Sequence, residues 1–180
     1  MRIDFMRDQA RQFEISVPPD QVTALRVWHC KYKSLKAIEA CENLRTLVIA
    51  TLPDDSIEFL GGLARLEYLR ILHMPKLRSL SALAGLEELR CLSLATAPSW
   101  DASRKRTVID ALEPLAELPA LKHIELLSIV PADRSLEPLT RVRYLESARF
   151  SGYQHNEVER FYAITQARND FVPCSVFGGG

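Results

Sequence analysis

An apolar residue recurs at every third position through five stretches of this chain, and each stretch ends in two apolar residues that stand two apart. The shared template is Leu-x-x-Leu-x-x-Leu-x-x-Leu-x-x-Leu-x-Leu, and its thirty positions are all apolar although only 47% of the chain is hydrophobic. Spacing by three is typical of 3₁₀ or loose helical turns, whereas the terminal spacing by two is typical of a short strand. Each copy therefore predicts one helical segment followed by one strand.

Five copies of the template follow a truncated strand motif. They occupy Leu35, Ile38, Cys41, Leu44, Leu47, Ile49; Leu60, Leu63, Leu66, Leu69, Leu72, Met74; Leu80, Leu83, Leu86, Leu89, Leu92, Leu94; Leu112, Leu115, Leu118, Leu121, Ile124, Leu126; and Leu136, Leu139, Val142, Leu145, Ala148, Phe150, after the truncated motif Val22, Leu25, Val27. Neither element of a single copy can bury its apolar face alone, so neighbouring copies must stack. The sequence predicts an α/β leucine-rich-repeat solenoid, with a curved parallel sheet of about six strands and helical or 3₁₀ segments on its convex side.

Repeat lengths, measured between equivalent strand positions, are 22, 25, 20, 32 and 24 residues. The 32-residue interval contains an insertion from Ala95 to Arg106. We expect a single domain, in which residues 22–151 form the repeats, residues 1–21 form an N-terminal cap, and residues 152–180 form a C-terminal capping helix and a loose tail. The caps would cover the strand edges at the two ends of the sheet.

Both caps carry local signals. Alternation of apolar and polar residues from Phe13 to Val17 predicts a capping strand before a Pro-Pro turn. Near the other end, Asn156 followed by Glu159 resembles a capping box that opens a helix. The tail from 171 to 180 is expected to be loose, because its three final glycines hold little structure.

Composition argues against several classes of partner and site. Lys and Arg number 23 and are balanced by 23 Asp and Glu, which gives no support to nucleic-acid binding. The first residues are too charged for a secretion signal, and no apolar stretch approaches the roughly 18 residues of a membrane span, so we expect a cytoplasmic protein that binds no membrane. The four cysteines, Cys30, Cys41, Cys91 and Cys174, lack metal-ligand spacing. Reduced thiols, with no metal or cofactor, are expected.

Residues 79–94 and the Leu-Glu-Pro-Leu sequences at 112–115 and 136–139 are similar to the repeats of internalin-like bacterial leucine-rich-repeat proteins. The resemblance covers about residues 22–150 and implies the solenoid fold. One departure is clear. Those families usually carry Asn three residues after the last strand leucine, where its side chain bonds the turn backbone; the equivalents here are Cys30, Leu52, Leu77, Ala97, Ile129 and Tyr153.

Alternation along each strand determines which side chains face outward from the concave sheet. The expected outward residues are Ala24, Arg26, Trp28; Thr46, Val48, Ala50; Ile71, His73, Pro75; Cys91, Ser93, Ala95; His123, Glu125, Leu127; and Ser147, Arg149, Ser151. Six strands about 4.8 Å apart give a face roughly 25 Å across. A small apolar centre flanked by aromatic and arginine side chains is typical of a protein interface. The alternative is an ordinary sheet surface on which scattered apolar residues have no function.

The interface hypothesis names specific residues. On the concave face they are Arg26, Trp28, Val48, Ile71, His73, Glu125 and Arg149. The insertion adds Trp100, Arg104 and Arg106, because loops on a rigid scaffold often carry recognition. The alternative for the insertion is a solvated excursion with Trp100 tucked against the edge of the solenoid.

The same strand columns contain two sets of residues that could support catalysis. Cys91 and His123 share a column on adjacent strands, and His73, Ser93 and Glu125 are expected to share the next. Neither set makes a convincing site, because Ser93 would separate His73 from the acid and an open sheet offers no oxyanion donors. We expect no enzyme activity, and an enzyme that uses Cys91 and His123 is the least favoured alternative.

The resemblance implies a protein-binding module. Among bacterial leucine-rich-repeat proteins of this size, without a secretion signal or an appended enzyme or membrane domain, a cytoplasmic immunity protein that neutralises a toxin or effector domain is the most specific expectation. An intracellular adaptor or regulator that binds an endogenous protein would use the same surface. The sequence does not separate these two roles.

Overall fold

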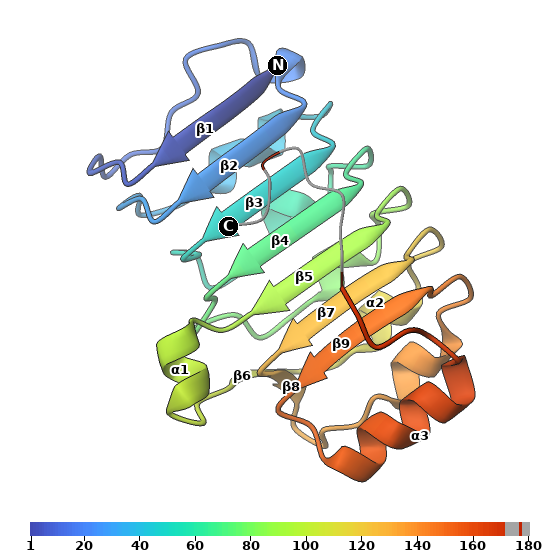
Figure 1. The fold of residues 1–180 in the computed structure, drawn as a ribbon. Helices are drawn as coiled ribbons and strands as arrows, with labels where there is room; N and C mark the ends of the chain where they lie inside the picture. The colour runs from blue at the N-terminus through green and yellow to red at the C-terminus, as the bar shows by residue number, and fades with distance from the viewer. Residues whose placement is uncertain (172–176, 178–180) are drawn as a thin grey trace.

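A computed structural model describes residues 1–171 and Phe177. Seven strands form one sheet in the order β1-β2-β3-β4-β5-β7-β9, and every neighbouring pair is parallel (Figure 1). Their bounds are β1 Arg2–Met6, β2 Ala24–Trp28, β3 Thr46–Ala50, β4 Tyr68–Leu72, β5 Cys91–Ala95, β7 His123–Leu127 and β9 Ser147–Ser151. The predicted leucine-rich-repeat solenoid with its parallel sheet is confirmed.

Short helical segments connect the strands and stack behind the sheet. They are η1 Pro19–Gln21, η2 Lys36–Ala40, η3 Glu58–Leu60, η4 Ser81–Leu83, α2 Glu113–Ala116 and η5 Glu137–Arg141. From η2 to η5 each segment contacts the next, in the order η2, η3, η4, α2, η5. Five are 3₁₀ turns and α2 is a single α-helical turn, as expected from apolar spacing by three.

The core lies between the sheet and these helical segments. Equivalent strand positions carry Leu25, Leu47, Leu69, Leu92, Ile124 and Ala148, which lie side by side in the strand register and are all 0% exposed. Burying one leucine of this row contributes roughly 1.5–3 kcal/mol. The stacked rows explain why the template tolerates so few polar residues.

The register of β4 differs from the expectation. Leu69 and Ile71 are the inward residues of this strand, and Ile71 is 0% exposed. Tyr68, Arg70 and Leu72 therefore occupy the outward positions, so the prediction that Ile71 and His73 face outward from the strand is wrong. The alignment of the repeat template with this strand is ambiguous, because apolar residues continue at spacing three on both sides of the strand. A shift of three positions is odd, and an odd shift exchanges the two faces of a strand.

The residue directly after each strand leaves the sheet in a left-handed conformation. Positive φ angles occur at Arg7 (54°), His29 (52°), Thr51 (72°), His73 (65°), Ser128 (57°) and Gly152 (88°), and Thr96, before the insertion, is the exception. The amides in this row are satisfied by the next repeat, since Thr51 N donates to Leu72 O at 2.7 Å and His73 N to Ala95 O at 2.7 Å. Each repeat thus fixes the backbone of the preceding turn through a hydrogen bond.

The N-terminal cap has a strand, but not where the alternation predicted it. β1 lies at Arg2–Met6 and pairs with β2, whereas residues 13–17 form no strand, so the expected capping strand there is wrong. Phe13 instead packs edge-on against Phe5 and Tyr32, with ring centroids 5.4 and 5.1 Å away. The apolar residues of this segment close the end of the core without joining the sheet.

The C-terminal helix is α3 (His155–Thr165), and it lies in the stretch for which the sequence predicts a capping helix. Its expected capping box is not formed: Gln154 precedes the helix without a side-chain cap, and Glu159 pairs with His155 at 3.1 Å. Glu157 makes the tertiary contact instead, accepting a 2.6 Å hydrogen bond from Leu136 N at the start of η5. The helix is therefore attached to the last repeat through a carboxylate on its first turn.

The insertion after β5 forms α1 (Pro98–Ala102) and then β6 (Thr107–Ile109), which pairs with β8 (Ile129–Pro131) in a small second sheet. In Figure 1, α1 projects beside the ends of the strands. After α3 the chain returns along β9, where Arg168 forms a parallel bridge with Ser147. Most of the tail that is expected to be loose, residues 172–176 and 178–180 with Cys174, lies outside the described residues; Phe177 is described and is 9% exposed.

Candidate protein-binding face

The outward side chains of the sheet form three columns that run across the strands. The first is Arg2, Ala24, Thr46, Tyr68, Cys91, His123 and Ser147; the second is Asp4, Arg26, Val48, Arg70, Ser93, Glu125 and Arg149; the third is Met6, Trp28, Ala50, Leu72, Ala95, Leu127 and Ser151. We call these the first, central and third columns. Except on β4, the outward residues named from the sequence stand where they were expected.

The central column begins with an ion pair between neighbouring strands. Arg26 Nε donates to Asp4 Oδ1 at 2.8 Å, and a second guanidinium nitrogen bonds the other carboxylate oxygen. This hydrogen bonding raises the pKa of Arg26. The two-point contact holds the planar guanidinium in one orientation over the sheet.

The other end of the central column carries a buried carboxylate. Glu125 is 7% exposed, accepts a 2.8 Å hydrogen bond from the Ser93 hydroxyl, and lies 3.5 Å from Arg149 Nη1. The Arg149 side chain is 56% exposed. Ser93 and Arg149 thus supply the polar partners that a buried carboxyl group requires, while Arg149 itself remains available to solvent.

Between these two clusters stands Arg70, which sequence reasoning missed because of the frame shift on β4. Its Nε is buried and has no hydrogen-bond partner among the described residues. It pairs in register with Val48 on one side and Ser93 on the other. The signal that could have found it is the 22-residue spacing of the preceding repeats, which places Arg26, Val48 and Arg70 in one column.

The third column is apolar and runs beside the charged central column. Trp28, Leu72 and Leu127 are half-buried, and the smaller Ala50 and Ala95 lie between them. An apolar strip beside arginines and a buried carboxylate has the composition of an interface core. This strip and the central column form the candidate binding surface.

A residue from the C-terminal end of the chain also lies on this face. Phe177 packs against Ala24, Val48 and Tyr68, with the half-buried Trp28 and Cys91 beside them. The Arg2 guanidinium carbon lies 4.4 Å from the Phe177 ring centroid, and that of Arg26 lies 5.1 Å away. No periodic pattern in the sequence indicates this contact.

His73 lies at the left-handed turn after β4, away from the three columns. Its ring meets Trp100 of α1 edge to face, with centroids 5.1 Å apart. Burial, and then the nearby His29, lower the pKa of His73. Trp100 is half-buried in this contact and Lys105 Nζ lies 5.6 Å from its ring centroid. Trp100 thus packs against the edge of the solenoid, as the alternative interpretation of the insertion predicts.

The two remaining insertion residues differ in environment. Arg104 is exposed and has a positive φ of 56°. Arg106 is half-buried, its Nε is buried without a partner among the described residues, and it lies where a Cβ added to Gly152 would meet that Nε at 3.0 Å. Arg106 therefore packs over the turn after β9, whereas Arg104 points into solvent.

Of the two sets of residues considered for catalysis, only the pair Cys91 and His123 lies together as expected. Cys91 and His123 do pair in register, but His123 Nδ1 lies 2.9 Å from the Ser147 hydroxyl and Nε2 lies 4.0 Å from Glu146 Oε2. Both ring nitrogens thus have neighbours on or next to β9. The proposed column of His73, Ser93 and Glu125 is wrong, because Arg70 takes the place assigned to His73. Ser93 and Glu125 remain hydrogen-bonded without a histidine.

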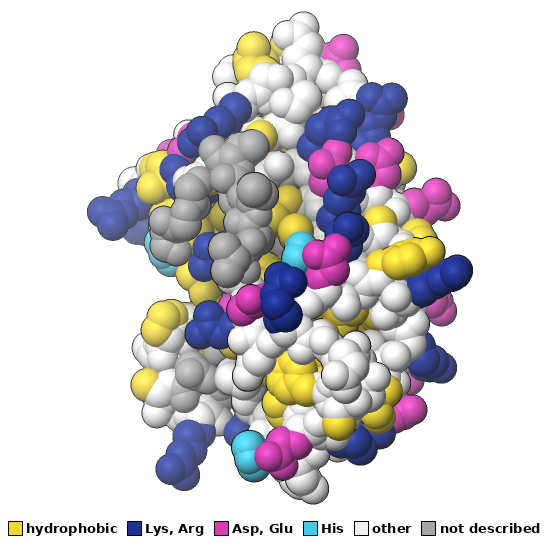
Figure 2. All heavy atoms as spheres, turned by 45° about the vertical axis from the view of Figure 1, so that its right-hand side comes forward, with side chains coloured by type: hydrophobic (Ala, Val, Ile, Leu, Met, Phe, Trp, Pro, Cys, Tyr) yellow, Lys and Arg dark blue, Asp and Glu magenta, His cyan; other side chains and the backbone are white. Residues whose placement is uncertain are grey.

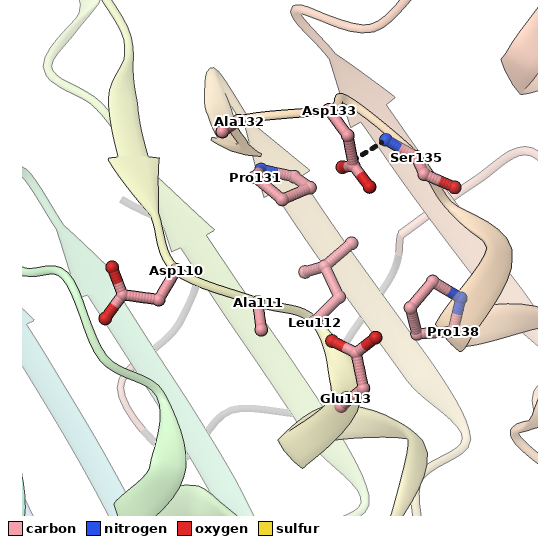
Figure 3. Close-up of a pocket in the computed structure, with 9 residues that line it drawn as sticks. All are labelled: Asp110, Ala111, Leu112, Glu113, Pro131, Ala132, Asp133, Ser135 and Pro138. Atoms are coloured by element: carbon pink, nitrogen blue, oxygen red, sulfur yellow. Dashed lines mark hydrogen bonds between the residues drawn. The ribbon is translucent and has the colours of Figure 1, made fainter.

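A separate pocket of about 420 Å³ lies between the loops after β6 and β8. Figure 3 shows that its three carboxylates, Asp110, Glu113 and Asp133, come from separate points on the rim and do not converge. The Asp133 carboxylate accepts a 3.0 Å hydrogen bond from Ser135 N. Within residues 1–171 and Phe177, no group of His, Cys, Asp and Glu is arranged to hold a metal ion.

Basic and acidic side chains alternate over the face shown in Figure 2, and neither sign dominates it. The thiols of Cys30 and Cys41 are free. No helix in the described part of the chain is long and apolar enough to cross a bilayer.

Comparisons with known proteins bear on the fold. No protein-family model matches the sequence, and no curated protein matches it. Among solved structures, internalin C2 of Listeria monocytogenes superposes with a TM-score of 0.54 at 22% identity, over 73% of this chain and 53% of that one. Internalin F of the same organism gives a TM-score of 0.45 at 18% identity, over 74% and 42%. The chain thus spans about half the length of these internalins. The similarity to internalin C2 shows that this chain has a bacterial-type leucine-rich-repeat fold.

Proposed function

We propose that this chain is a non-catalytic protein-binding module whose concave face docks a partner protein. The observation that carries the proposal is the central column, where Arg26 is held by Asp4, Glu125 is buried between Ser93 and Arg149, and the apolar third column lies alongside. Side chains held before binding lose little conformational entropy when a partner docks. Arginine and tryptophan are also the residue types that most often anchor interfaces.

Trp28 and Arg149 are the proposed anchors. Trp28 is half-buried at the N-terminal end of the face, and the Arg149 side chain is 56% exposed at the other end. A partner that contacts both must span the sheet from β2 to β9, which suits a folded domain. Each anchor truncated to alanine is expected to weaken binding by about 1 to 4 kcal/mol. The insertion residue Arg104 would contact a partner that extends past the strand ends.

The more specific proposal is a cytoplasmic immunity protein that occludes a toxin or effector domain. It is supported by the likeness of the repeats to bacterial leucine-rich-repeat proteins. A central column that carries carboxylates as well as arginines also suits a protein partner better than nucleic acid. An adaptor for an endogenous protein would use the same anchors. The identity of the partner distinguishes the two roles, since an immunity protein binds a toxin and an adaptor binds an endogenous protein.

Affinity capture from a lysate of the source cells tests the proposal. The bait is the wild type, a concave pair variant (Trp28→Ala with Arg149→Ala), and a control pair on the exposed convex segment η2 (Lys36→Ala with Glu39→Ala). We expect one dominant protein that is retained by the wild type and the control and lost by the concave pair. Equal retention by all three would contradict a concave site, provided that circular dichroism shows all three folded.

A further inference from the structure

A side chain from outside the repeats is seated on the candidate binding face. Phe177 is 9% exposed although it follows the capping helix by a dozen residues and belongs to no repeat. It lies on Ala24 of β2, Val48 of β3 and Tyr68 of β4, which form a cluster distinct from the main core behind the sheet. Stacking of the repeats does not require this contact. The concave face therefore has a place for an apolar ring that its own tail fills.

The surroundings of this place favour an aromatic ring over an aliphatic side chain. The guanidinium groups of Arg2 and Arg26 lie over the Phe177 ring, at 4.4 and 5.1 Å from its centroid. A cation over a ring face is attracted by the ring quadrupole, which a leucine or valine lacks. Arg26 is fixed in this position by its two-point contact with Asp4. Ala24 and Val48 provide the apolar floor.

We propose that Arg2, Ala24, Arg26, Val48 and Tyr68 form an aromatic socket, which binds a phenylalanine-type side chain from a polypeptide. In the free protein Phe177 occupies the socket in cis, and a docking partner inserts its own aromatic side chain in its place. The second part rests on the proposed protein-binding function, whereas occupancy by Phe177 does not. The socket adjoins Trp28, so the partner's aromatic side chain would enter next to a proposed anchor.

Self-occupancy has a measurable consequence for affinity. A partner must displace Phe177 before it can fill the socket. The apparent affinity of the partner is therefore its intrinsic affinity multiplied by the fraction of molecules in which the socket is empty. Removing the Phe177 ring should strengthen binding of any ligand that inserts an aromatic side chain. It should leave binding at sites distant from the socket unchanged.

Trp28 fluorescence tests occupancy without a partner. In a Trp100→Phe background only Trp28 emits. Because Trp28 packs against the cluster that contains Phe177, Phe177→Ala should admit water to this cluster and shift the Trp28 emission to longer wavelength. Ile164→Ala, on an exposed part of α3, is the matched control and should cause no shift. An unchanged Trp28 spectrum in Phe177→Ala, with the far-ultraviolet circular dichroism of the wild type, would overturn occupancy of the socket in cis.

A peptide in trans tests recognition. The probe is a fluorescently labelled synthetic peptide with the sequence of residues 171–180 and Cys174→Ser, compared with the same peptide carrying Phe177→Ala. By fluorescence anisotropy the first peptide should bind the full-length Phe177→Ala protein about tenfold more tightly than the wild type, and adding Val48→Asp to that protein should abolish binding. Equal binding of the two peptides, or no binding of either up to about 1 mM, would overturn the socket.

Sedimentation separates the two sources of the occupying ring. A monomer for both wild type and Phe177→Ala is expected from occupancy in cis. If the wild type is a dimer and Phe177→Ala is a monomer, occupancy in cis would be overturned, and the ring in the socket would belong to a second copy of the chain. These outcomes are independent of the capture experiment, in which failure of the proposed function appears as equal retention by wild type and concave pair.

Discussion

The Ser93 hydroxyl on β5 donates a 2.8 Å hydrogen bond to the Glu125 carboxylate on β7, and the two residues are 0% and 7% exposed. Arg149 lies on the other side of the carboxylate at 3.5 Å. The Glu125 side chain is thus held within the surface of the sheet by one neighbour on each side. The centre of the proposed binding face is organised before any partner arrives, and this order depends on parallel register between three strands.

Removing the Ser93 hydroxyl should destabilise the protein. Ser93→Ala leaves the buried Glu125 carboxylate without its closest partner, and we expect a loss of about 1–3 kcal/mol in the free energy of unfolding. Urea denaturation monitored by circular dichroism measures it. Ser103→Ala, at an exposed residue whose hydroxyl bonds the Ser99 carbonyl, should change the free energy by no more than about 0.5 kcal/mol. Equal effects of the two substitutions would show that the contact with Glu125 contributes nothing.

Truncating a core leucine should cost more than truncating an exposed aliphatic residue. Leu92 is 0% exposed in the central row of the core, so Leu92→Ala is expected to lower the free energy of unfolding by about 2–5 kcal/mol through the cavity it leaves. Ile164 is 53% exposed on α3, and Ile164→Ala should stay within about 0.5 kcal/mol of the wild type. The comparison is made in the same urea titrations. A cost below about 1 kcal/mol at Leu92 would contradict the assigned register of β5.

Two glycines should respond oppositely to alanine. Gly152 has a φ of +88°, and an added Cβ would meet Arg106 Nε at 3.0 Å and Ser128 Cα at 3.3 Å, so Gly152→Ala should destabilise by about 1 kcal/mol or more. Gly62 does not have a positive φ, and an added Cβ would meet nothing within 4 Å. Gly62→Ala should therefore be neutral or stabilising by up to about 1 kcal/mol. Thermal unfolding of both variants would reveal the contrast, and similar shifts in Tm would refute it.

Stability should depend on pH through the attachment of the capping helix. Hydrogen bonding from Arg160, then from Leu136 N, lowers the pKa of Glu157 below its ordinary value of 4.5, although partial burial opposes the shift. A lowered folded-state pKa contributes stability that is present above the unfolded-state pKa and lost as pH falls through the folded-state pKa. Glu157→Gln should therefore cost about 1 kcal/mol near pH 7 and progressively less below about pH 4.

The control for this prediction is Glu159→Gln on the same helix, where the side chain is 65% exposed and pairs with His155. Urea unfolding from about pH 7 to about pH 3 should show a pH-dependent difference from wild type for Glu157→Gln and a negligible one for Glu159→Gln. A constant difference across this range would mean that the ionised carboxylate of Glu157 is not what fastens α3 to η5.

The repeat template predicted most of the fold, because the stacked core directly requires apolar residues at this spacing. Leu25, Leu47 and Leu92 could be assigned to one buried row from the sequence, and the strands that contain them pair as expected. The template failed on β4, since Leu69 and Leu72 both continue the spacing by three. Only the 22-residue spacing between Leu47 and Leu69 distinguishes the two frames, and it shows that Arg70 belongs to the binding face.

The features that sequence reasoning missed depend on contacts between distant segments. Residues 13–17 alternate like a strand, yet the edge they would cover is taken by β1, and Phe13 packs with Phe5 and Tyr32 instead. Phe177 lies in a stretch without periodicity, and its neighbours belong to the first repeats. Propensity and periodicity describe local structure, so they could not pair that ring with Arg2 and Arg26.

Titration of the captured partner, once purified, against three forms of this protein tests the concave-face account most directly. Isothermal titration calorimetry should give the same Kd for the wild type and for the η2 control pair, Lys36→Ala with Glu39→Ala. The concave pair, Trp28→Ala with Arg149→Ala, should raise Kd at least about tenfold, which corresponds to about 1.4 kcal/mol. An unchanged Kd for a folded concave pair, or a loss of affinity confined to the η2 pair, would contradict docking on this face.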